Sequence, residues 1–174
     1  EEPLVQTRKG DEIICDMRND VPFLCHAGGD SGSVSIGSDC SGMETPTVAA
    51  KRLIKKLIHK FSSEIDARAI KYILANFQPE KMFEDLTLRD VLTTPYCDVY
   101  SSGFPCQPFS TAGAQQGEAD SRGRGKIFDF VVSYILSKKP NIFILENVKN
   151  IKFVQGGQFY KKILEASGKM VDYN

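Results

Sequence analysis

An α/β fold with a parallel sheet is predicted for the part of the chain that begins at residue 34. From there, short apolar segments of strand length alternate with segments whose apolar residues recur at helical spacing. The run Ile142–Leu145 is continuously apolar, as expected of a strand that is covered on both faces. Strands that alternate with helices in this way favour a parallel sheet.

The first half of the predicted fold contains two strand–helix units. A strand at residues 34–36 leads through Gly37-Ser38-Asp39 into a turn. Thr45-Pro46 then begins a helix that extends to about residue 56, because threonine can cap a helix and proline suits its first position. A second strand at residues 57–62 is followed by a helix that Asp66 caps.

The second half continues the alternation and contains a long polar loop. The predicted elements are a weak strand at 82–83, a strand at 98–102, a Gly-, Ser- and Gln-rich loop at 103–126, a helix at 127–137, a strand at 142–145 and a helix at 159–166. Pro140 stops the first of these helices, and Gly168 is expected to end the last.

Polar or reactive residues follow each of the five predicted strands. They are Asp39, Glu64, Asp85, Cys106 and Glu146, in chain order. In open parallel sheets, ligands bind beyond the carboxyl ends of the strands. The sequence therefore predicts a functional site at this edge of the sheet, without yet indicating its chemistry.

The composition is that of an ordinary globular protein. Among 174 residues, 22 Lys and Arg balance 22 Asp and Glu, so the zero net charge gives no support for a nucleic-acid-binding class, although a local basic patch would fit it. No run of 18 apolar residues occurs, so a membrane-spanning helix is not expected. Residues 1–33 are predicted to form an N-terminal extension that ends in a Gly- and Ser-rich linker, and residues 34–174 to form the domain.

The cysteines indicate free thiols rather than disulfides or a metal site. Their number is odd, and no apolar signal segment follows a basic start. They lie at positions Cys15, Cys25, Cys40, Cys97 and Cys106, without a Cys-x-x-Cys spacing. We expect a protein without bound metal in a reducing, intracellular compartment, the nucleus in a eukaryote or the cytoplasm and nucleoid in a bacterium.

Three motifs follow one another in the second half of the chain. Residues 103–110 read Gly-Phe-Pro-Cys-Gln-Pro-Phe-Ser, residues 120–123 read Asp-Ser-Arg-Gly, and Glu146-Asn147-Val148 follows the last apolar run. In order and spacing they resemble the Pro-Cys-Gln motif, the mobile catalytic loop and the Glu-Asn-Val motif of the cytosine-C5 DNA methyltransferases. The resemblance covers about residues 34–168 and implies a Rossmann-like S-adenosylmethionine-dependent methyltransferase sheet, truncated so that its last strands are missing. Residues 34–174 would be a partial catalytic domain.

The resemblance implies a covalent mechanism with Cys106 as nucleophile and Glu146 as its acid/base partner. Cytosine C5 is a poor nucleophile until a thiolate adds at C6. Glu146 would protonate or hydrogen-bond N3 of the ring, for which its carboxyl group should lie in a dry pocket. The cytosine of double-stranded DNA must be flipped out of the stack to react. The residues expected to contact the substrate are Phe104, Pro105, Arg122 and Asn147.

The resemblance also implies a site for the methyl donor, S-adenosyl-L-methionine. Gly42 matches a glycine that lets the backbone approach the cofactor, with Asp39 and Cys40 beside it. Glu64 would accept the ribose hydroxyls, while Ile65 packs on the adenine. Asp85 and Leu86 match a motif in which an aspartate accepts from the adenine amino group. The chain departs from the family in two places, because Cys40 replaces an aromatic residue and Asp39 lies one position late.

The resemblance stops before the parts of the family that read DNA. We therefore expect a fragment or one half of a split enzyme, with an open apolar sheet edge and a complementary C-terminal half as a possible partner. Two other functions stay open: methylation of cytosine in transfer RNA, and a non-catalytic module that binds the cofactor or a partner enzyme. A cysteine hydrolase is remote, because no histidine follows Cys106.

Overall fold

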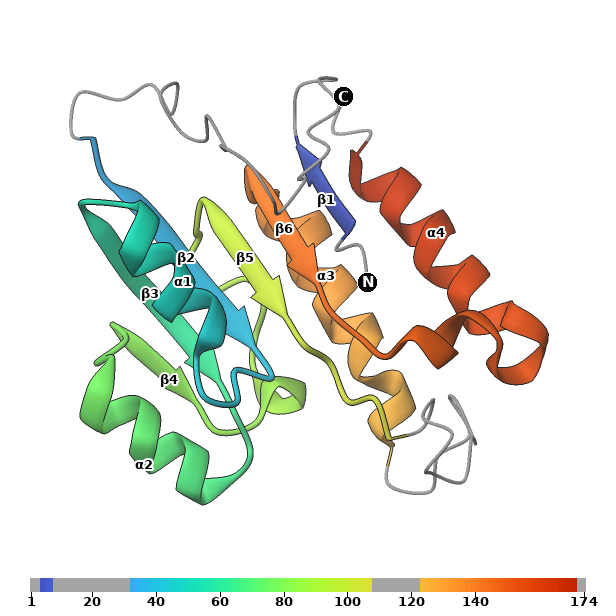
Figure 1. The fold of residues 1–174 in the computed structure, drawn as a ribbon, viewed down its shortest axis with the longest axis horizontal. Helices are drawn as coiled ribbons and strands as arrows, with labels where there is room; N and C mark the ends of the chain where they lie inside the picture. Colours follow the sequence, from blue (N-terminus) through green and yellow to red (C-terminus); the bar gives the residue numbers. More distant parts are fainter. Residues whose placement is uncertain (1–3, 8–31, 108–122, 172–174) are drawn as a thin grey trace.

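The computed structural model describes residues 4–7, 32–107 and 123–171, which form one sheet with helices on both faces (Figure 1). The elements are β1 (Leu4–Thr7), β2 (Val34–Asp39), α1 (Thr45–Leu53), β3 (Leu57–Ser63), α2 (Ala67–Asn76), β4 (Lys81–Phe83), η1 (Leu86–Leu88), β5 (Val99–Ser102), η3 (Arg124–Lys126), α3 (Ile127–Lys138), β6 (Ile142–Leu145), η4 (Lys149–Lys152), η5 (Val154–Gly157) and α4 (Gln158–Val171).

The sheet has the order β1-β6-β5-β2-β3-β4 within the described residues. All neighbours from β6 to β4 are parallel, as the sequence predicts. The chain adds strands in one direction from β2 to β4 and in the other from β5 to β6, so the strand order reverses between β2 and β5. In open α/β sheets such a reversal marks the crevice where ligands bind.

Alternate residues of the central strands face opposite helices. On one face, Phe61, Tyr100 and Phe143 pack against residues of α3 that include Val131 and Tyr134. On the other face, Val34, Ile36 and Val99 pack with Ala50 of α1. A third cluster joins α3 to α4 through η4 and η5, and its buried members are Phe104, Phe128, Ile151, Val154, Phe159 and Ile163. The core therefore lies in two layers, one on each side of the sheet.

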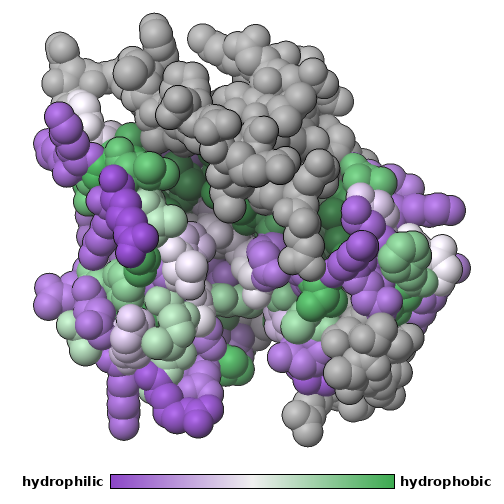
Figure 2. Space-filling model, in the orientation of Figure 1, coloured by the Kyte–Doolittle hydropathy of each residue, from purple (hydrophilic) through white to green (hydrophobic). Residues whose placement is uncertain are grey.

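The surface over α1 and α2 is mainly polar. In the space-filling view, hydrophilic side chains gather along the side of the molecule that carries these helices, with hydrophobic residues between them (Figure 2). The exposed hydrophobic residues of the two helices are Leu53, Tyr72 and Leu74. Each helix thus buries only one of its sides, as expected of helices that cover a sheet.

The edge of the sheet beside β6 is not open, contrary to the expectation from the sequence. Residues Leu4–Thr7, within the predicted N-terminal extension, pair antiparallel with Ile142–Leu145 as β1. This pairing satisfies the backbone groups that the strand would otherwise leave exposed.

Two helices differ in length from the prediction. α1 ends at Leu53 rather than near residue 56, because Ile54 is extended (φ −112°) and the chain enters β3 three residues later. α4 runs to Val171, past Gly168. A glycine inside a helix costs only about 1 kcal/mol relative to alanine, which does not by itself end the helix.

Candidate active site

The carboxyl ends of the five parallel strands lie at one level of the sheet. Asp39 at the end of β2 is in register with Ser63 of β3 and Ser102 of β5. Ser63 is in register with Phe83 of β4, and Ser102 with Leu145 of β6. The polar residues that follow these strands therefore leave the sheet along the same edge.

The segments after β5 and β6 are held side by side. The backbone N–H of Glu146 donates to the carbonyl oxygen of Ser102 over 3.0 Å. A Cβ atom placed on Gly103 would lie 3.3 Å from Oε2 of Glu146, so the carboxylate lies against the backbone that leads to Cys106. The side-chain amide of Asn147 donates to the carbonyl oxygen of Phe104 over 2.8 Å. These contacts bring the two predicted catalytic segments together.

Three thiols of the described residues differ in their surroundings. Burial, followed by the charges of Asp39 and Glu64, raises the pKa of Cys40 to about 12. Burial also raises the pKa of Cys97 to about 12. Both thiols stay protonated at neutral pH, so neither is suited to act as a nucleophile. Cys106 is free and half-buried on the segment beyond β5.

The residues predicted to contact the substrate divide into three kinds. Phe104 is 3% exposed and packs against Phe128 and Phe159, so its ring belongs to the core, and its contact with the substrate stays a prediction. Asn147 links two loops, and Pro105 is half-buried beside Cys106. Arg122 lies outside the described residues, as do Asp120 and most of the predicted catalytic loop.

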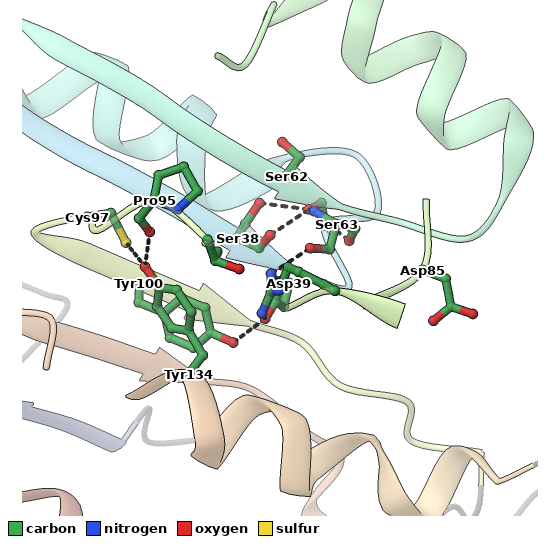
Figure 3. A network of polar contacts seen from close by, with 12 residues as sticks. Ser38, Asp39, Ser62, Ser63, Asp85, Pro95, Cys97, Tyr100 and Tyr134 are labelled. Atoms are coloured by element: carbon green, nitrogen blue, oxygen red, sulfur yellow. Dashed lines mark hydrogen bonds and ion pairs between the residues drawn. The ribbon is translucent and has the colours of Figure 1, made fainter. Parts of the chain in front are cut away.

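Asp39 is the centre of a buried ion pair rather than an open ligand. Its carboxylate accepts from the guanidinium of Arg89, over 2.7 Å at Oδ2, and from the hydroxyl of Tyr100 over 2.6 Å (Figure 3). The side chains of Asp39 and Arg89 are 0% and 2% exposed. Both oxygens thus accept hydrogen bonds from protein groups, and the contact of Asp39 with the cofactor stays a prediction.

Arg89 completes this pair and also packs on aromatic rings. Its guanidinium carbon lies 5.2–5.3 Å from the ring centres of Phe61, Phe83 and Tyr134. Burial opposes its charge, but the charge and hydrogen bonds of Asp39 hold the pKa of Arg89 above its ordinary value. Arg89 is not predicted from the sequence, because an arginine in a polar segment is typical of the protein surface.

Gly42 and Glu64 form one unit at the ends of β2 and β3. Gly42 has φ 52°, and no atom lies within 4 Å of the point where a Cβ would be. Its N–H donates to Oε2 of Glu64 over 2.8 Å, while Oε1 accepts from the N–H groups of Ile65 and Asp66. Ile65 is 75% exposed. The glycine backbone faces open space, and an apolar side chain lies exposed beside the carboxylate.

Asp85 follows β4 and lies apart from the Asp39 network (Figure 3), whereas Leu86 begins η1 and its carbonyl oxygen accepts from the N–H of Arg89. Asp85 caps η1 by accepting from the N–H and hydroxyl of Thr87 over 2.8 and 2.7 Å. Leu86 is 8% exposed and lines a cleft of about 270 Å³ between η1 and α3. The other lining residues are Arg89, Asp90, Val91, Phe130 and Ser133.

The described residues contain neither a metal-binding cluster nor a membrane-spanning helix. No group of three or more His, Cys, Asp or Glu side chains is placed to hold a metal ion within residues 32–107 and 123–166. In the same part of the chain, no helix has the length and apolar character needed to cross a membrane.

The whole of the parallel sheet and the segments beyond it match a known family. Residues 34–174 fit the family model described as C-5 cytosine-specific DNA methylase. The chain belongs to this family. The type II methyltransferase M.NlaX of Neisseria lactamica is 45% identical over 104 residues, which are 60% of this chain and 33% of that protein. M1.ScrFI of Lactococcus lactis subsp. cremoris, also a type II methyltransferase, is 44% identical over 110 residues, or 63% of this chain and 28% of the relative.

A solved structure confirms the methyltransferase fold. The crystal structure of S. pombe Dnmt2 methyltransferase aligns with a TM-score of 0.55 and 16% sequence identity, covering 76% of this chain and 40% of that one. This C-5 cytosine methylase chain spans about a third of the length of the curated relatives it matches.

Proposed function

We propose that this chain is the catalytic portion of an enzyme that transfers a methyl group from S-adenosyl-L-methionine to C5 of cytosine in DNA. The observation that supports this most directly is the contact between the segments after β5 and β6. It brings the backbone that leads to Cys106 against the carboxylate of Glu146. A Cβ atom placed on Gly103 would lie 3.3 Å from Oε2 of Glu146. Family membership supports the same reaction.

In the proposed reaction the thiolate of Cys106 adds to C6 of the cytosine ring. Electron density moves through the ring to N3, where Glu146 donates a proton or a hydrogen bond. C5 is then electron-rich and would bond to the methyl carbon as the bond from that carbon to the sulfur of the donor breaks, with the electron pair staying on the sulfur. After methyl transfer, a base removes the proton from C5, the C6–sulfur bond breaks, and Cys106 leaves as a thiolate.

Glu146 does not lie in a dry pocket in the structure. In the described part of the chain Glu146 is exposed, whereas the sequence predicts that its carboxyl group lies in a dry pocket. A carboxyl group is desolvated only when another surface covers it. We propose that the flipped base itself provides that surface, so that Glu146 loses water when substrate binds.

The residues at the ends of β2, β3 and β4 fit the methyl donor. Gly42 leaves open space beside its backbone, so a ligand can approach it closely. Oε2 of Glu64 accepts one hydrogen bond within the protein and can accept another, which suits a ribose hydroxyl. Ile65 and Asp85 would contact the adenine, from its face and its amino group. When bound there, S-adenosyl-L-methionine supplies the methyl group.

The substrate and partner follow from the same proposal. The target carbon is inaccessible in a stacked duplex, so the cytosine must be extruded into the site at a cost of a few kcal/mol. Because the chain spans about a third of its relatives, we propose that activity requires a complementary C-terminal portion.

A mechanism-based trap tests the proposal. The chain is fused to the remaining portion of a relative such as M.NlaX and incubated with S-adenosyl-L-methionine and duplex DNA that carries 5-fluorocytosine. Fluorine cannot leave C5 as a proton does, so we expect an adduct that survives denaturing electrophoresis. Cys106→Ser should abolish the adduct, since a serine hydroxyl ionises far less at neutral pH. Glu146→Gln should slow its formation by roughly 10²–10⁴-fold.

Cys97→Ser is the matched control, because this buried thiol lies in the core beside Tyr134. It should form the adduct at the wild-type rate. Undiminished trapping by Cys106→Ser would overturn the covalent mechanism. Trapping on RNA that contains 5-fluorocytidine, but not on DNA, would replace the proposed substrate.

A further inference from the structure

A second carboxylate, that of Glu44, is buried next to the loop that we assign to the methyl donor. Glu44 is 0% exposed and lies two residues after Gly42, at the start of α1. Its backbone is left-handed, with φ 57° and ψ 37°. This conformation is unfavourable for a residue with a Cβ atom, so it persists only where the surroundings stabilise it.

Three hydroxyl groups from three elements stabilise the carboxylate. Oε1 accepts from Ser38 of β2 over 2.6 Å and from Ser62 of β3 over 2.5 Å. Oε2 accepts from Thr47 of α1 over 2.6 Å. Ser62 also contacts Nε2 of His59 at 3.0 Å, and this nitrogen lies 3.6 Å from Oε1 of Glu44. The carboxylate thus joins two strands and a helix.

The same residues connect directly to the loop between β2 and α1. The hydroxyl of Ser41 is 2.7 Å from that of Ser38 and donates to the carbonyl oxygen of Ser63 over 3.1 Å. The backbone N–H of Glu44 donates to the carbonyl oxygen of Ser41 over 2.8 Å, which closes a turn around Gly42. The N–H of Gly42 then points at Glu64.

We propose that Glu44 is a positioning residue for the methyl-donor loop. Its carboxylate holds residues 40–42 in the geometry that directs the Gly42 backbone toward Glu64, and so sets the affinity for S-adenosyl-L-methionine. This role rests on the proposed function, because it assumes that Gly42 and Glu64 bind that cofactor. Glu44 does not touch the cofactor itself.

The charge state of Glu44 agrees with this role. Burial opposes ionisation, but the hydrogen bonds from His59, Ser38, Ser62 and Thr47 outweigh it and hold the pKa of Glu44 below its ordinary range. An ionised carboxylate accepts from all three hydroxyls at once, whereas an amide has only one accepting oxygen. Glu44→Gln is therefore a conservative change of shape that removes part of the network.

Two measurements on the 174-residue chain test the proposal. Calorimetric titration with S-adenosyl-L-methionine should show affinity about tenfold lower for Glu44→Gln, the effect of losing about one strong hydrogen bond. Hydrogen exchange should show faster exchange at the Ser41 and Gly42 amides of this variant, without cofactor. Ser62→Ala removes one donor and should give a smaller change in the same direction. It keeps the test informative if Glu44→Gln does not fold.

Asp98→Asn is the matched control. Asp98 also gathers hydroxyl, amide and backbone donors, from Ser35 and Asn141, but at the opposite end of the sheet. It should change stability and leave the affinity for the cofactor within about twofold. Equal affinity and equal amide exchange in the wild type, Glu44→Gln and Ser62→Ala would overturn the positioning role. If the wild type and Glu64→Ala gave the same heats, the cofactor assignment would fail instead, and amide exchange alone would decide whether Glu44 holds the loop.

Discussion

Asp39 and Glu44 are two buried carboxylates near the carboxyl end of β2 that are stabilised in different ways. Asp39 faces a cation, the guanidinium of Arg89. Glu44 faces neutral hydroxyl groups on the side of the sheet that carries α1. Removing the charge of Asp39 leaves a buried, unpaired cation, whereas removing that of Glu44 leaves none. The two sites should therefore respond differently to similar substitutions.

We expect Asp39→Asn to destabilise the fold by about 3–5 kcal/mol, because it breaks a fully buried ion pair and leaves Arg89 without compensation. The free energy of unfolding from urea denaturation measures this. The double variant Asp39→Asn with Arg89→Met removes both charges and should recover part of the loss.

Asp85→Asn provides the comparison for Asp39→Asn. Asp85 is half-buried, and its contacts are to its own turn at Thr87. Asparagine is also a good capping residue, so the loss should stay below about 1 kcal/mol. Equal losses for the two variants would show that Asp39 is not a structural centre of the domain.

At the scale of the elements, the sheet depends on one close approach between β2 and β3. The register shifts between Ile36 and Gly37. Lys60 therefore has no residue opposite it in β2, and Phe61 lies opposite Gly37. A Cβ on Gly37 would lie 2.7 Å from Cδ1 and Cζ of Phe61, a ring that is 0% exposed. The glycine thus provides the room that the ring occupies.

Gly37→Ala should accordingly cost about 1–3 kcal/mol, the usual effect of overpacking a core. Thermal and urea unfolding would measure it. Phe61→Leu alone also destabilises, but in the double variant the two losses should not add, because the smaller side chain makes room for the methyl group. Simple additivity would show that Gly37 and Phe61 do not share this space.

The sequence predicts the elements that are determined by residues next to them in the chain, such as helix caps. Asp66 caps α2 through the N–H groups of Arg68 and Ala69, as its sequence position indicates. Pro46 lies in the first turn of α1, but the helix begins at Thr45 and its N-cap is Glu44 rather than the predicted Thr45. In contrast, β1 exists only because the edge of β6 is available for pairing, and four residues carry too little pattern to reveal that. The 3₁₀ turns η4 and η5 depend on packing beneath Phe104 and Phe159 in the same way.

In the candidate site, too, the residues in local motifs could be predicted from the sequence, and the residues held by distant partners could not. The motifs around Cys106 and Glu146 are short and ordered, so they could be found without a structure. Arg89 could not, because its partner Asp39 lies 50 positions away in the chain. The signal for Glu44 was present but faint: an acidic residue just before Thr45-Pro46, at the start of a predicted helix. Its burial depends on hydroxyls that only the sheet brings together.

At the scale of the whole molecule, the stability of the fold depends on pH although the net charge is zero, because the ionisation of some groups is coupled to folding. Cys97 is 0% exposed, and burial raises the pKa of its thiol from the usual 9.0 to about 12. Above about pH 9 the unfolded chain releases this proton while the folded chain keeps it. The stability linked to this thiol is complete below that pH and is lost as the pH rises toward 12.

Cys97→Ser should flatten the alkaline part of the stability profile. The serine hydroxyl can keep the contact with Tyr134 but does not ionise in this range. Relative to the variant, the reduced wild type should lose up to about 1.4 kcal/mol per pH unit above pH 9. Urea denaturation at pH 8, 9 and 10, in the presence of a reductant, would measure the difference. Parallel profiles would contradict the coupling, since every other ionisable group is the same in both proteins.

The pairing of β1 with β6 has a consequence for how the molecule is made. Among the described strands, β1 is synthesised before the others, and its partner β6 is synthesised last. At about 5–20 residues translated per second, the backbone of β1 stays unpaired for several seconds before β6 is made. The centre of the sheet needs no such delay, because β2 and β3 are close in the chain and pair as soon as both have emerged.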